Sequence, residues 1–497
     1  MIYCKYLPTG SNAGETILKK RAKIVLIFGI LILSLALAVI SLVCNGKFAS
    51  GCYFSYEINA DSQTCTVTKC IPLGTRNITV PETIRGYRVS KIGAYAFANR
   101  ANLTDISLPE GLEMIGMGAF YECESLQEIK IPNSVTAIGS YAFFGCEGLT
   151  SITLSANATD IGARVFEGCT SIAEASVPTW AISTLPAESI ERLAINGGTH
   201  IGSYAFKGFA SLTDITLSPS IESISINAFK GCTNITSATV PAELISHIPK
   251  NKLIKLVING GTHISERACY YFYHLTSITL PESIVSIGER AFEGCYQLAQ
   301  IYNFSPLKLE IGALDNGGIA RYALDIVTVP ESSSKTWADN AGYLFYEDSE
   351  VCYLLGYMGE ETELTLPDTC NGREYSIRAY AFYMYSDITA VTIPNGVIGM
   401  EAYAFAHCRS VESLTYPDTL ISIGDYAFYE CDKLSQISFG KSIASIGAFA
   451  FDECYSLTDV TFRGTVAEWQ AVAKGYYWIF YTPATEVVCT DGAVDLK

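Results

Sequence analysis

One phrase of 23 residues recurs through most of the chain, and this period restricts the fold more than any other feature. An Ala-Phe pair marks the register in most copies, and its phenylalanine position is filled in turn by Phe97, Phe120, Phe143, Phe166, Phe206, Phe229, Cys269, Phe292, Phe382, Phe405, Phe428 and Phe451. A unit this short cannot bury its own apolar side, whereas stacked copies share a continuous core. The repeat therefore predicts a solenoid of stacked coils.

Two steps in this series are longer than the rest. Phe166 to Phe206 and Phe229 to Cys269 each span 40 residues, and their additional residues match one another as SVPTWAISTLPAESIERLAINGGTHI and TVPAELISHIPKNKLIKLVINGGTHI. The second half of each insertion opens with LAIN or LVIN, which reads as a strand, and continues into a Gly-Gly turn. Each long unit is therefore predicted to contain two coils.

The phrase itself describes one coil. In L-x-x-I-x-[LI]-P the alternating apolar positions predict a short strand with one face inward, and proline ends it because proline cannot donate to the ladder. The next I-G turns the chain. A-F-x-x-C-x-x-L has the spacing of a single helical or 3-10 turn that packs Phe, Cys and Leu inside. The predicted fold class is an α/β repeat, with a parallel sheet on one face and short helical turns opposite.

The phrase, seen at 126–149 as LQEIKIPNSVTAIGSYAFFGCEGL, resembles the BspA-like subclass of bacterial leucine-rich repeats. The resemblance covers nearly all of the chain after residue 52. Departures from the phrase are local: Ser218 replaces the strand-ending proline, and Arg100, Phe209, Phe272 and Tyr385 occupy cysteine positions. The resemblance implies a leucine-rich-repeat solenoid at a cell surface, a role in adhesion, and no agreed catalytic motif.

The repeats are expected to form two blocks that begin with related caps. The irregular units NITVPETIRGYRVSKIGAYAF and ELTLPDTCNGREYSIRAYAF each follow an aromatic stretch predicted to pair as a hairpin. At the far end, Thr465 and Glu468 have the spacing of a capping box that opens a short helix with Trp469. The expected boundaries are a basic segment 1–23, an apolar segment 24–43, a cap and irregular repeat 52–90, block 1 at 91–298, a junction 299–342, a cap with block 2 at 343–462, and a terminal cap 463–497.

The N-terminal apolar segment predicts a membrane anchor. Residues 24–43 are 20 uncharged and almost wholly apolar residues, a length that matches the hydrocarbon core of roughly 30 Å at 1.5 Å per residue. The basic KKRAK before them keeps that end in the cytoplasm and places the rest of the chain outside. Cleavage after Gly51, which would release a secreted protein, and lipid attachment at Cys44 remain alternatives, although the apolar segment is long for a signal peptide and Val43 is bulky before Cys44.

Charge and motifs argue against several classes of function. The formal charge of −17 means that phosphate backbones would be repelled, which argues against a nucleic-acid partner. The sequence contains no G-x-S-x-G, H-E-x-x-H, C-x-x-C or phosphate-binding glycine loop, so we expect no enzymatic activity, no cofactor and no metal. His200 and His263 both follow Gly-Gly-Thr, but about three coils, or ~14 Å, separate them, too far to share a metal.

The cysteines fall into two groups. Eight of them share one repeat position: Cys123, Cys146, Cys169, Cys232, Cys295, Cys408, Cys431 and Cys454. We expect these to be buried thiols, because parallel neighbours in a ladder seldom adopt the S–S dihedral near 90° and free cysteine packs well as a small hydrophobe. Cys52, Cys65 and Cys70 lie in the N-terminal cap, where one disulfide among them is an open alternative.

Two rows of side chains are candidates for binding. The middle residue of each I-x-[LI] strand points outward, and the predicted binding face consists of Thr153, Thr216, Thr239, Thr279, Thr392, Thr415 and Thr461. A tyrosine ladder is predicted two residues before the phenylalanine position, at Tyr95, Tyr141, Tyr204, Tyr380, Tyr403 and Tyr426. Threonine is also a good exposed strand former, and tyrosines also pack ring on ring, so both rows have a purely structural interpretation.

These observations favour a non-enzymatic recognition protein at the cell surface that binds an extracellular protein, of a host matrix or cell, through an extended face of the solenoid. One alternative is a module that binds glycans or the cell wall and uses the tyrosines as a stacking platform. Another is a structural spacer in the envelope. A convergent pocket, which an enzyme would need, is expected only at the junction 299–342.

Overall fold

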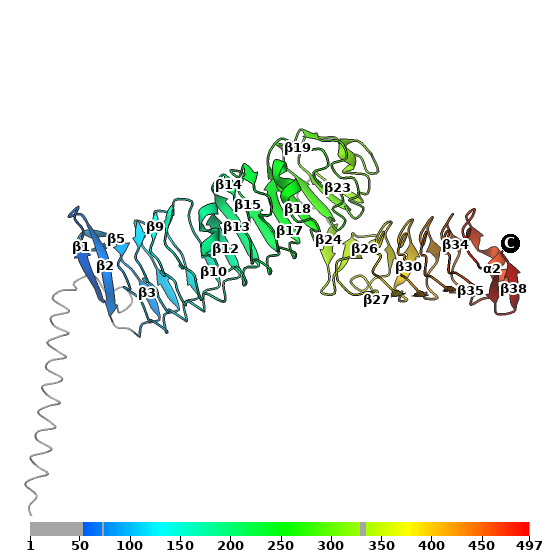
Figure 1. Ribbon diagram of the computed structural model, residues 1–497, viewed down its shortest axis with the longest axis horizontal. Helices are drawn as coiled ribbons and strands as arrows, with labels where there is room; N and C mark the ends of the chain where they lie inside the picture. The colour runs from blue at the N-terminus through cyan, green and yellow to red at the C-terminus, as the bar shows by residue number, and fades with distance from the viewer. Residues whose placement is uncertain (1–52, 72–73, 329–333, 497) are drawn as a thin grey trace, which may run out of the picture. The chain divides into compact units, whose positions relative to one another are not determined.

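The structure is a computed structural model that describes residues 53–71, 74–328 and 334–496. The chain divides into two compact units, one ending at Ser189 and the other starting at Ile190. Within each unit, short strands from successive coils lie side by side (Figure 1). Among the residues described, no helix is long and apolar enough to cross a membrane, and the predicted anchor at 24–43 lies outside them.

The first unit contains two stacks of strands. One stack is β1 (Tyr53–Ile58), β2 (Thr64–Ile71), β5 (Tyr87–Ile92), β7 (Met114–Ile115), β9 (Ala137–Ile138) and β11 (Asp160–Ile161), with β4 (Thr83–Ile84) beside β5. The other stack consists of β3 (Asn77–Thr79), β6 (Asp105–Ser107) and β8 (Glu128–Ile129). After it, β10 (Ser151–Thr153) pairs with β12 (Glu174–Pro178). The 3-10 helix η1 (Thr179–Thr184) follows β12 directly. The β1–β2 pair is the antiparallel hairpin that the aromatic stretch predicted.

The second unit begins with the longer repeats. Its first sheet includes β13 (Arg192–Gly197), β15 (Asp214–Leu217), β17 (Ser237–Pro241), β18 (Lys255–Gly260), β20 (Ser277–Leu280), β22 (Gln300–Asn303) and β23 (Asp325–Val327). Two small two-stranded sheets belong to the same repeats: β14 (His200–Ile201) with β16 (Ser223–Ile224), and β19 (His263–Ile264) with β21 (Ser286–Ile287). This part of the chain also contains the 3-10 helices η2 (Ala242–His247) and η3 (Asn316–Gly318). β13 and β18 are the strands predicted at LAIN and LVIN.

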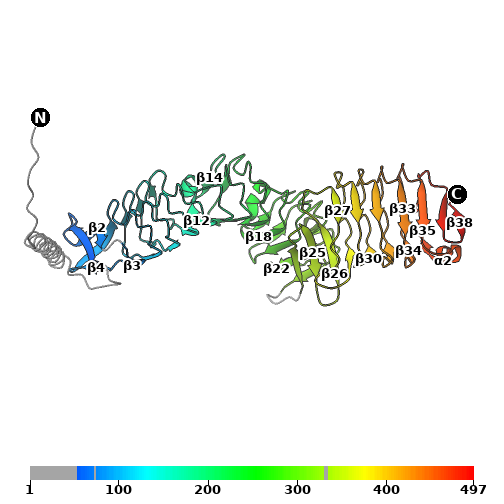
Figure 2. The same ribbon diagram turned by 90° about the horizontal axis from the view of Figure 1, so that it is seen from below.

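The later repeats of the second unit again form separate stacks (Figure 2). One is β24 (Lys335–Ala338), β25 (Tyr343–Glu347), β26 (Cys352–Tyr357), β28 (Tyr375–Ile377), β30 (Val397–Met400), β32 (Ser422–Ile423), β34 (Ser445–Ile446) and β36 (Ala473–Lys474). The others are β27 (Glu363–Thr365), β29 (Ala390–Thr392) and β31 (Ser413–Thr415), and then β33 (Gln436–Phe439), β35 (Asp459–Phe462), β37 (Glu486–Cys489) and β38 (Gly492–Asp495). The predicted second hairpin is β25 with β26.

A typical coil therefore supplies two strands where the sequence predicted one. The isoleucine of the I-G pair, which the sequence placed in a turn, forms a second parallel ladder together with the residue before it, as in the pairing of Ile115 with Ile138. The glycine of I-G follows this strand because the coils approach closely there. A Cβ on Gly139 would lie 2.4 Å from the backbone nitrogen of Met117 in the preceding coil.

The A-F-x-x-C segments are the single turns that the spacing predicted, and they do not extend into helices. They do contain hydrogen bonds of the i to i−3 kind, such as Cys123 N–H to Phe120 O at 3.2 Å. The helix cannot continue because residues two before and two after the phenylalanine position adopt positive φ, as Tyr403 (φ 60°) and His407 (φ 62°) do around Phe405. The fold is therefore a solenoid of strands and turns with little helix.

Ring stacking and buried thiols form the core of each unit. Phe97 stacks on Phe120, and Phe120 on Phe143, with ring centroids 5.3 and 5.1 Å apart. In the second unit Phe405 lies between Phe382 at 4.6 Å and Phe428 at 5.3 Å. All eight repeat cysteines are buried, and each thiol donates a hydrogen bond to a carbonyl of the preceding coil, between 3.0 and 3.4 Å away: Cys123, Cys146, Cys169, Cys232, Cys295, Cys408, Cys431 and Cys454. The prediction of buried thiols is confirmed.

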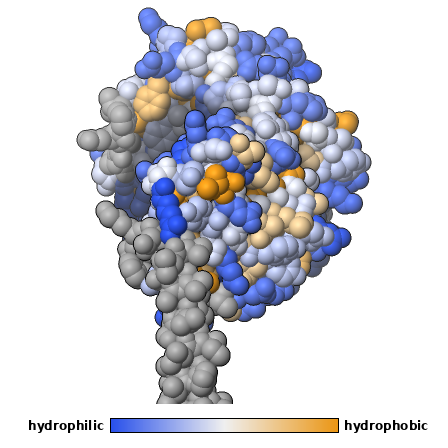
Figure 3. Space-filling view, turned by 90° about the vertical axis from the view of Figure 1, so that its left-hand side faces the viewer, coloured by the Kyte–Doolittle hydropathy of each residue, from blue (hydrophilic) through white to orange (hydrophobic). Residues whose placement is uncertain are grey.

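The first unit begins with a cap and the second unit ends with one. At the C-terminal end α2 (Val466–Ala471) carries the predicted capping box, in which Glu468 N–H donates to Thr465 Oγ1 and Thr465 N–H donates to Glu468 Oε2. Trp469 of this helix is buried against Phe439 and Phe462. Seen from the end that carries β1 and β2, the coloured surface is mostly hydrophilic with small apolar patches (Figure 3). Such caps keep the last apolar coil from water.

The phenylalanine stack predicts a large stability loss from one substitution. Phe405→Ala should lower the free energy of unfolding of the second unit by about 3–5 kcal/mol, because it opens a cavity between two stacked rings. Phe405→Leu keeps most of the volume and should cost less than about 2 kcal/mol. Urea unfolding followed by circular dichroism measures both. Tyr455→Ala, at a side chain that is 57% exposed, is the matched control, and an equal loss there would contradict this account.

The cysteine ladder predicts unreactive thiols. Burial raises the pKa of the Cys123 thiol to about 11 and of the Cys295 thiol to about 12, so the nucleophilic thiolate is scarce at neutral pH. We expect iodoacetamide at pH 8 to leave the eight repeat cysteines unmodified in the native chain and to modify them in urea, with peptide mass spectrometry as the measurement. Rapid labelling of Cys431 before unfolding would contradict the buried ladder.

Candidate functional site

The predicted threonine face is divided into separate stretches. In the first unit Thr153 is exposed and pairs with Ser176. In the second unit the first stretch passes through Thr216, Thr239, Val257 and Thr279 in register, and its threonines are half-buried. A valine thus interrupts the hydroxyl row.

The later repeats of the second unit carry the most open stretch. Thr365 pairs with Thr392, and Thr392 with Thr415, so three exposed hydroxyls lie on neighbouring strands β27, β29 and β31. We call these three residues the threonine row. Thr461, half-buried, lies in a separate sheet opposite Ser438. Sequence reasoning missed Thr365, although ELTLP fits the strand phrase, because the coil that follows it is irregular.

The predicted tyrosine ladder is continuous only in the later repeats. Tyr380, Tyr403 and Tyr426 stack with nearly parallel rings, 5.0 and 4.8 Å between centroids, and Phe449 extends the stack at 4.9 Å. Each of the three tyrosines is half-buried. Because neighbouring rings cover both faces of Tyr403, its ring offers only an edge to a ligand.

In the earlier repeats the ladder tyrosines stand apart. Gly118 occupies the position between Tyr95 and Tyr141, so Tyr95 meets Tyr121 edge-on and Tyr141 meets Phe144 edge-on. Tyr95 is 51% exposed, and in the second unit Tyr204 is 46% exposed with Lys230 over its ring. The six tyrosines therefore do not form one platform.

Within the second unit the two repeat blocks meet through aromatic side chains. Tyr296 of the earlier repeats stacks on Tyr380 of the later ones, with ring centroids 4.7 Å apart. Gln297 is buried beside them, and its Nε2 donates to the carbonyl of Ala381 at 3.2 Å. A buried amide that bonds a backbone carbonyl fixes the register of the two blocks.

His274 and Tyr385 complete this contact. The Tyr385 hydroxyl donates to the carbonyl of Tyr357 at 2.5 Å and lies 3.3 Å from His274 Nδ1. Burial, with a smaller contribution from nearby Lys252, lowers the pKa of His274 to about 4, so the imidazole is neutral at pH 7. Tyr385 occupies a cysteine position of the repeat; in place of a thiol it uses its hydroxyl to join the blocks.

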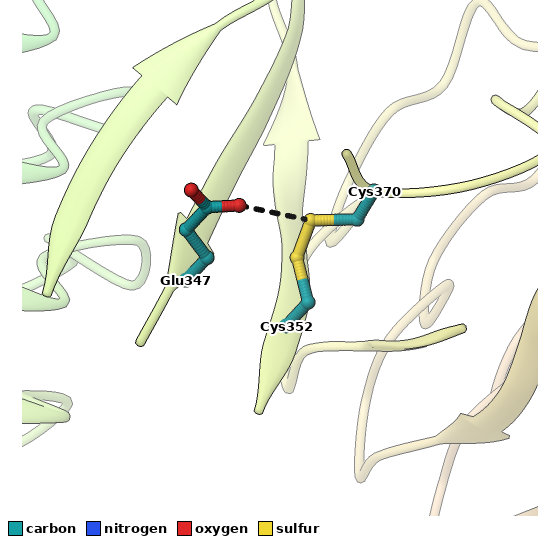
Figure 4. Close-up of side chains that lie close together, drawn as sticks. All are labelled: Glu347, Cys352 and Cys370. Carbon is teal, nitrogen blue, oxygen red and sulfur yellow. Dashed lines mark hydrogen bonds between the residues drawn. A yellow bond between two sulfur atoms is a disulfide. The ribbon is translucent and has the colours of Figure 1, made fainter. Parts of the chain in front are cut away.

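A disulfide staples the cap of the later repeats. Cys352 of β26 is bonded to Cys370, and the carboxylate of Glu347 lies 3.9 Å from the Cys370 sulfur (Figure 4). The sequence prediction placed the open disulfide question in the other cap instead. There, Cys65 holds the position that corresponds to Cys352 but is a buried free thiol, and Cys52 lies outside the described residues. The signal that was missed is Cys370 itself, which stands where the related first cap has Ile84.

Metal-binding geometry is limited to this same place. Among the residues that the structure describes, one group of His, Cys, Asp or Glu side chains comes close enough to hold an ion, namely Glu347, Cys352 and Cys370. Both sulfurs are in the disulfide, and Lys335 Nζ pairs with Glu347 at 2.8 Å, so the group offers no thiolate ligand. His200 and His263 bond separately to serines of the next coil.

The stacked coils, the strand phrase and the aromatic core define a leucine-rich-repeat solenoid. Residues 90–196, 187–298, 262–312 and 373–473 match the BspA type leucine rich repeat region. These segments cover more than half of the chain, which therefore belongs to the BspA-type leucine-rich-repeat family. The resemblance seen in the sequence is confirmed.

Solved structures of bacterial leucine-rich-repeat proteins are similar to this chain. A leucine rich cell surface protein from Faecalibacterium prausnitzii is 20% identical, with a TM-score of 0.27, and the match covers 86% of this chain and 97% of that one. A leucine-rich repeat protein from Bacteroides ovatus is 21% identical, with a TM-score of 0.28 and coverage of 88% and 99%. The pneumococcal vaccine antigen PcpA is 14% identical, with a TM-score of 0.27 and coverage of 89% and 88%. Among curated proteins, no sequence matches this chain.

The neutral His274 predicts a pH-dependent stability of the second unit. Its pKa is lower in the folded chain, about 4, than the ordinary 6.5, so the unfolded chain binds more protons as the pH falls between these values. Stability contributed by the neutral imidazole is present above pH 6.5 and is lost toward pH 4. Relative to His274→Gln, the native chain should lose about 1–3 kcal/mol of unfolding free energy over this interval.

Urea unfolding at pH 7.5, 6, 5 and 4 measures this difference. His263→Gln is the matched control, because His263 is exposed and its imidazole bonds only Ser286 among the described residues. Parallel pH profiles for the native chain and His274→Gln would contradict a buried neutral imidazole.

Proposed function

We propose that the protein is a non-enzymatic recognition protein of the cell surface that binds an extracellular protein ligand through an extended face of its second unit. Residues 24–43 would anchor it, with the basic N-terminal end in the cytoplasm. The cell-surface role is supported by the BspA-type repeats and by the Cys352–Cys370 disulfide, since disulfides persist in oxidising compartments outside the cytosol.

The observation that carries this proposal is the threonine row. Thr365, Thr392 and Thr415 are exposed on paired strands, so their hydroxyls follow one line across the sheet. The exposed carboxylate of Glu363 lies beside the row on β27, and exposed Glu412, which pairs with Lys433 at 3.5 Å, lies just before β31. Hydroxyls and carboxylates on a rigid surface recognise donors and positive charge, which suits a basic protein partner.

A second candidate, glycan binding, is favoured by the terminal cap and not by the predicted ladder. Tyr476, Tyr477 and Tyr481 are 68%, 57% and 63% exposed, and Phe480 lies among them at 42%. Rings with an open face can stack on the apolar side of a sugar. The half-buried ladder of Tyr380, Tyr403 and Tyr426 has covered ring faces and is less suited to this role.

The test is binding of the full-length chain, held in detergent, to arrayed matrix proteins and glycans. Thr392→Lys with Thr415→Lys should weaken binding of a protein ligand at least tenfold, because two cations replace neutral hydroxyls facing a basic partner. Thr233→Lys, at an exposed threonine away from the row, is the control and should change affinity little.

Three outcomes are informative. Loss of protein binding in the double variant alone supports the proposal. Glycan binding that disappears with Tyr476→Ala and Tyr477→Ala would replace it with the second candidate. If the chain binds to neither array, a structural spacer in the envelope becomes the favoured interpretation.

A further inference from the structure

A cleft lies beside the contact between the two repeat blocks of the second unit. Its volume is about 480 Å³, and its walls come from the turn at 273–274, the segment after β26, and the turn at 383–388. Tyr273, Tyr357 and Tyr383 are among the lining residues; Tyr357 is buried, and the Tyr273 ring stacks with Tyr271 and Tyr296 at centroid distances of 5.3 and 6.4 Å. Tyr273 is 37% exposed, so part of its ring is open to a ligand.

The rim of this cleft is acidic. Glu360, Glu361 and Asp387 line it, and all three are exposed. Lys252 lies 3.4 Å from Glu360 and balances one of these charges. Among the described residues, Glu361 and Asp387 form no salt bridge, and the neutral His274 adds no positive charge, so the cleft keeps an excess of negative charge over its aromatic walls.

The lining also indicates what the cleft does not select. Its described walls contain no arginine, so an anion lacks a partner there. They contain no asparagine or glutamine, so the carboxylates of this lining have no planar amide side chain beside them. Carboxylates beside partly exposed aromatic side chains are instead the combination that attracts an alkyl ammonium group, through direct charge on the cation and apolar contact with its methylenes.

A second hollow continues this surface toward the threonine row. It shares Tyr357, Glu360 and Glu361 with the cleft and extends to Glu363 and Thr365. The segment after β26 is thus a common wall of both hollows. A side chain seated in the cleft would come from a ligand whose backbone passes over Glu363 and the row.

We propose that this cleft binds an alkyl ammonium group, the side chain of a lysine in a basic peptide segment, with the ammonium held by Glu361 and Asp387 and the alkyl arm packed against the exposed part of Tyr273 and against Tyr383. This inference rests on the proposed function and specifies part of its ligand. A free quaternary amine shares the same chemistry and is the other source that the experiment distinguishes.

The test uses the full-length chain and a short glycine–serine peptide with a single lysine. Saturation-transfer NMR and calorimetry compare it with the same peptide carrying Nε-acetyl-lysine, with tetramethylammonium, and with a neutral disaccharide. The lysine peptide should bind, and acetylation, which removes the charge but keeps the arm, should abolish binding. If tetramethylammonium competes with the peptide, the site recognises the cation alone. If the peptide binds and tetramethylammonium does not compete, the site also recognises the aliphatic part of the lysine side chain.

Paired variants locate the site. Glu361→Gln with Asp387→Asn should weaken peptide binding about tenfold, whereas Glu282→Gln, the same change at an exposed carboxylate elsewhere in the unit, should leave it within twofold. Raising the salt concentration should weaken binding in the native chain more than in the double variant.

Equal affinity for lysine and acetyl-lysine peptides, binding unchanged in the double variant, preference for the disaccharide, or no binding at all would each overturn the assignment. These results are separable from the proposed function. A protein ligand lost with Thr392→Lys and Thr415→Lys but retained in Glu361→Gln with Asp387→Asn would keep the recognition role and remove the ammonium site.

Discussion

Stacking of each coil on the next is the interaction on which this structure depends. In a single coil, the phenylalanine ring and the cysteine thiol would stay exposed to water, because one coil has too few apolar side chains to cover them. Phe405 becomes fully covered because Phe382 and Phe428 lie on either side of it, and the Cys431 thiol donates a hydrogen bond to the carbonyl of Phe405 in the preceding coil. The stability of such an array is approximately the sum of the stabilities of its repeats and of the interfaces between adjacent repeats. Where the regular repeat is interrupted, other contacts must therefore replace the missing interface.

The junction between the repeat blocks of the second unit shows how this requirement shapes a functional surface. The regular stack ends where the sequence no longer follows the 23-residue phrase. Ring stacking and hydrogen bonds replace the missing contacts between coils there, and they come from Tyr296, Gln297 and Tyr385. Two blocks joined in this way do not fill space as regularly as consecutive coils do. The acidic aromatic cleft and the hollow beside it lie where regular stacking lapses.

The features that follow from the 23-residue period could be predicted from the sequence. The features that depend on contacts between residues distant in the sequence could not. The register of Phe97 to Phe451, the buried cysteines, both hairpins and the capping box at Thr465 follow from local spacing. The spacing predicted single helical or 3-10 turns at A-F-x-x-C, but it could not show the positive φ of residues such as Tyr403, which limits each segment to one turn. The Cys352–Cys370 bond and the cleft around Tyr273 and Asp387 depend on how non-repeating segments pack, which no period encodes. From the junction 299–342, where a pocket was expected, Asn340 and Ala341 line the second hollow.

Amide hydrogen exchange of the full-length chain, with and without a protein ligand found on the arrays, tests the central claim most directly. If the later repeats of the second unit form the recognition face, the ligand should slow exchange in β27, β29 and β31 and in residues 357–361, while the first unit remains unchanged. Protection confined to the terminal cap around Tyr476, or to the first unit, would contradict the account.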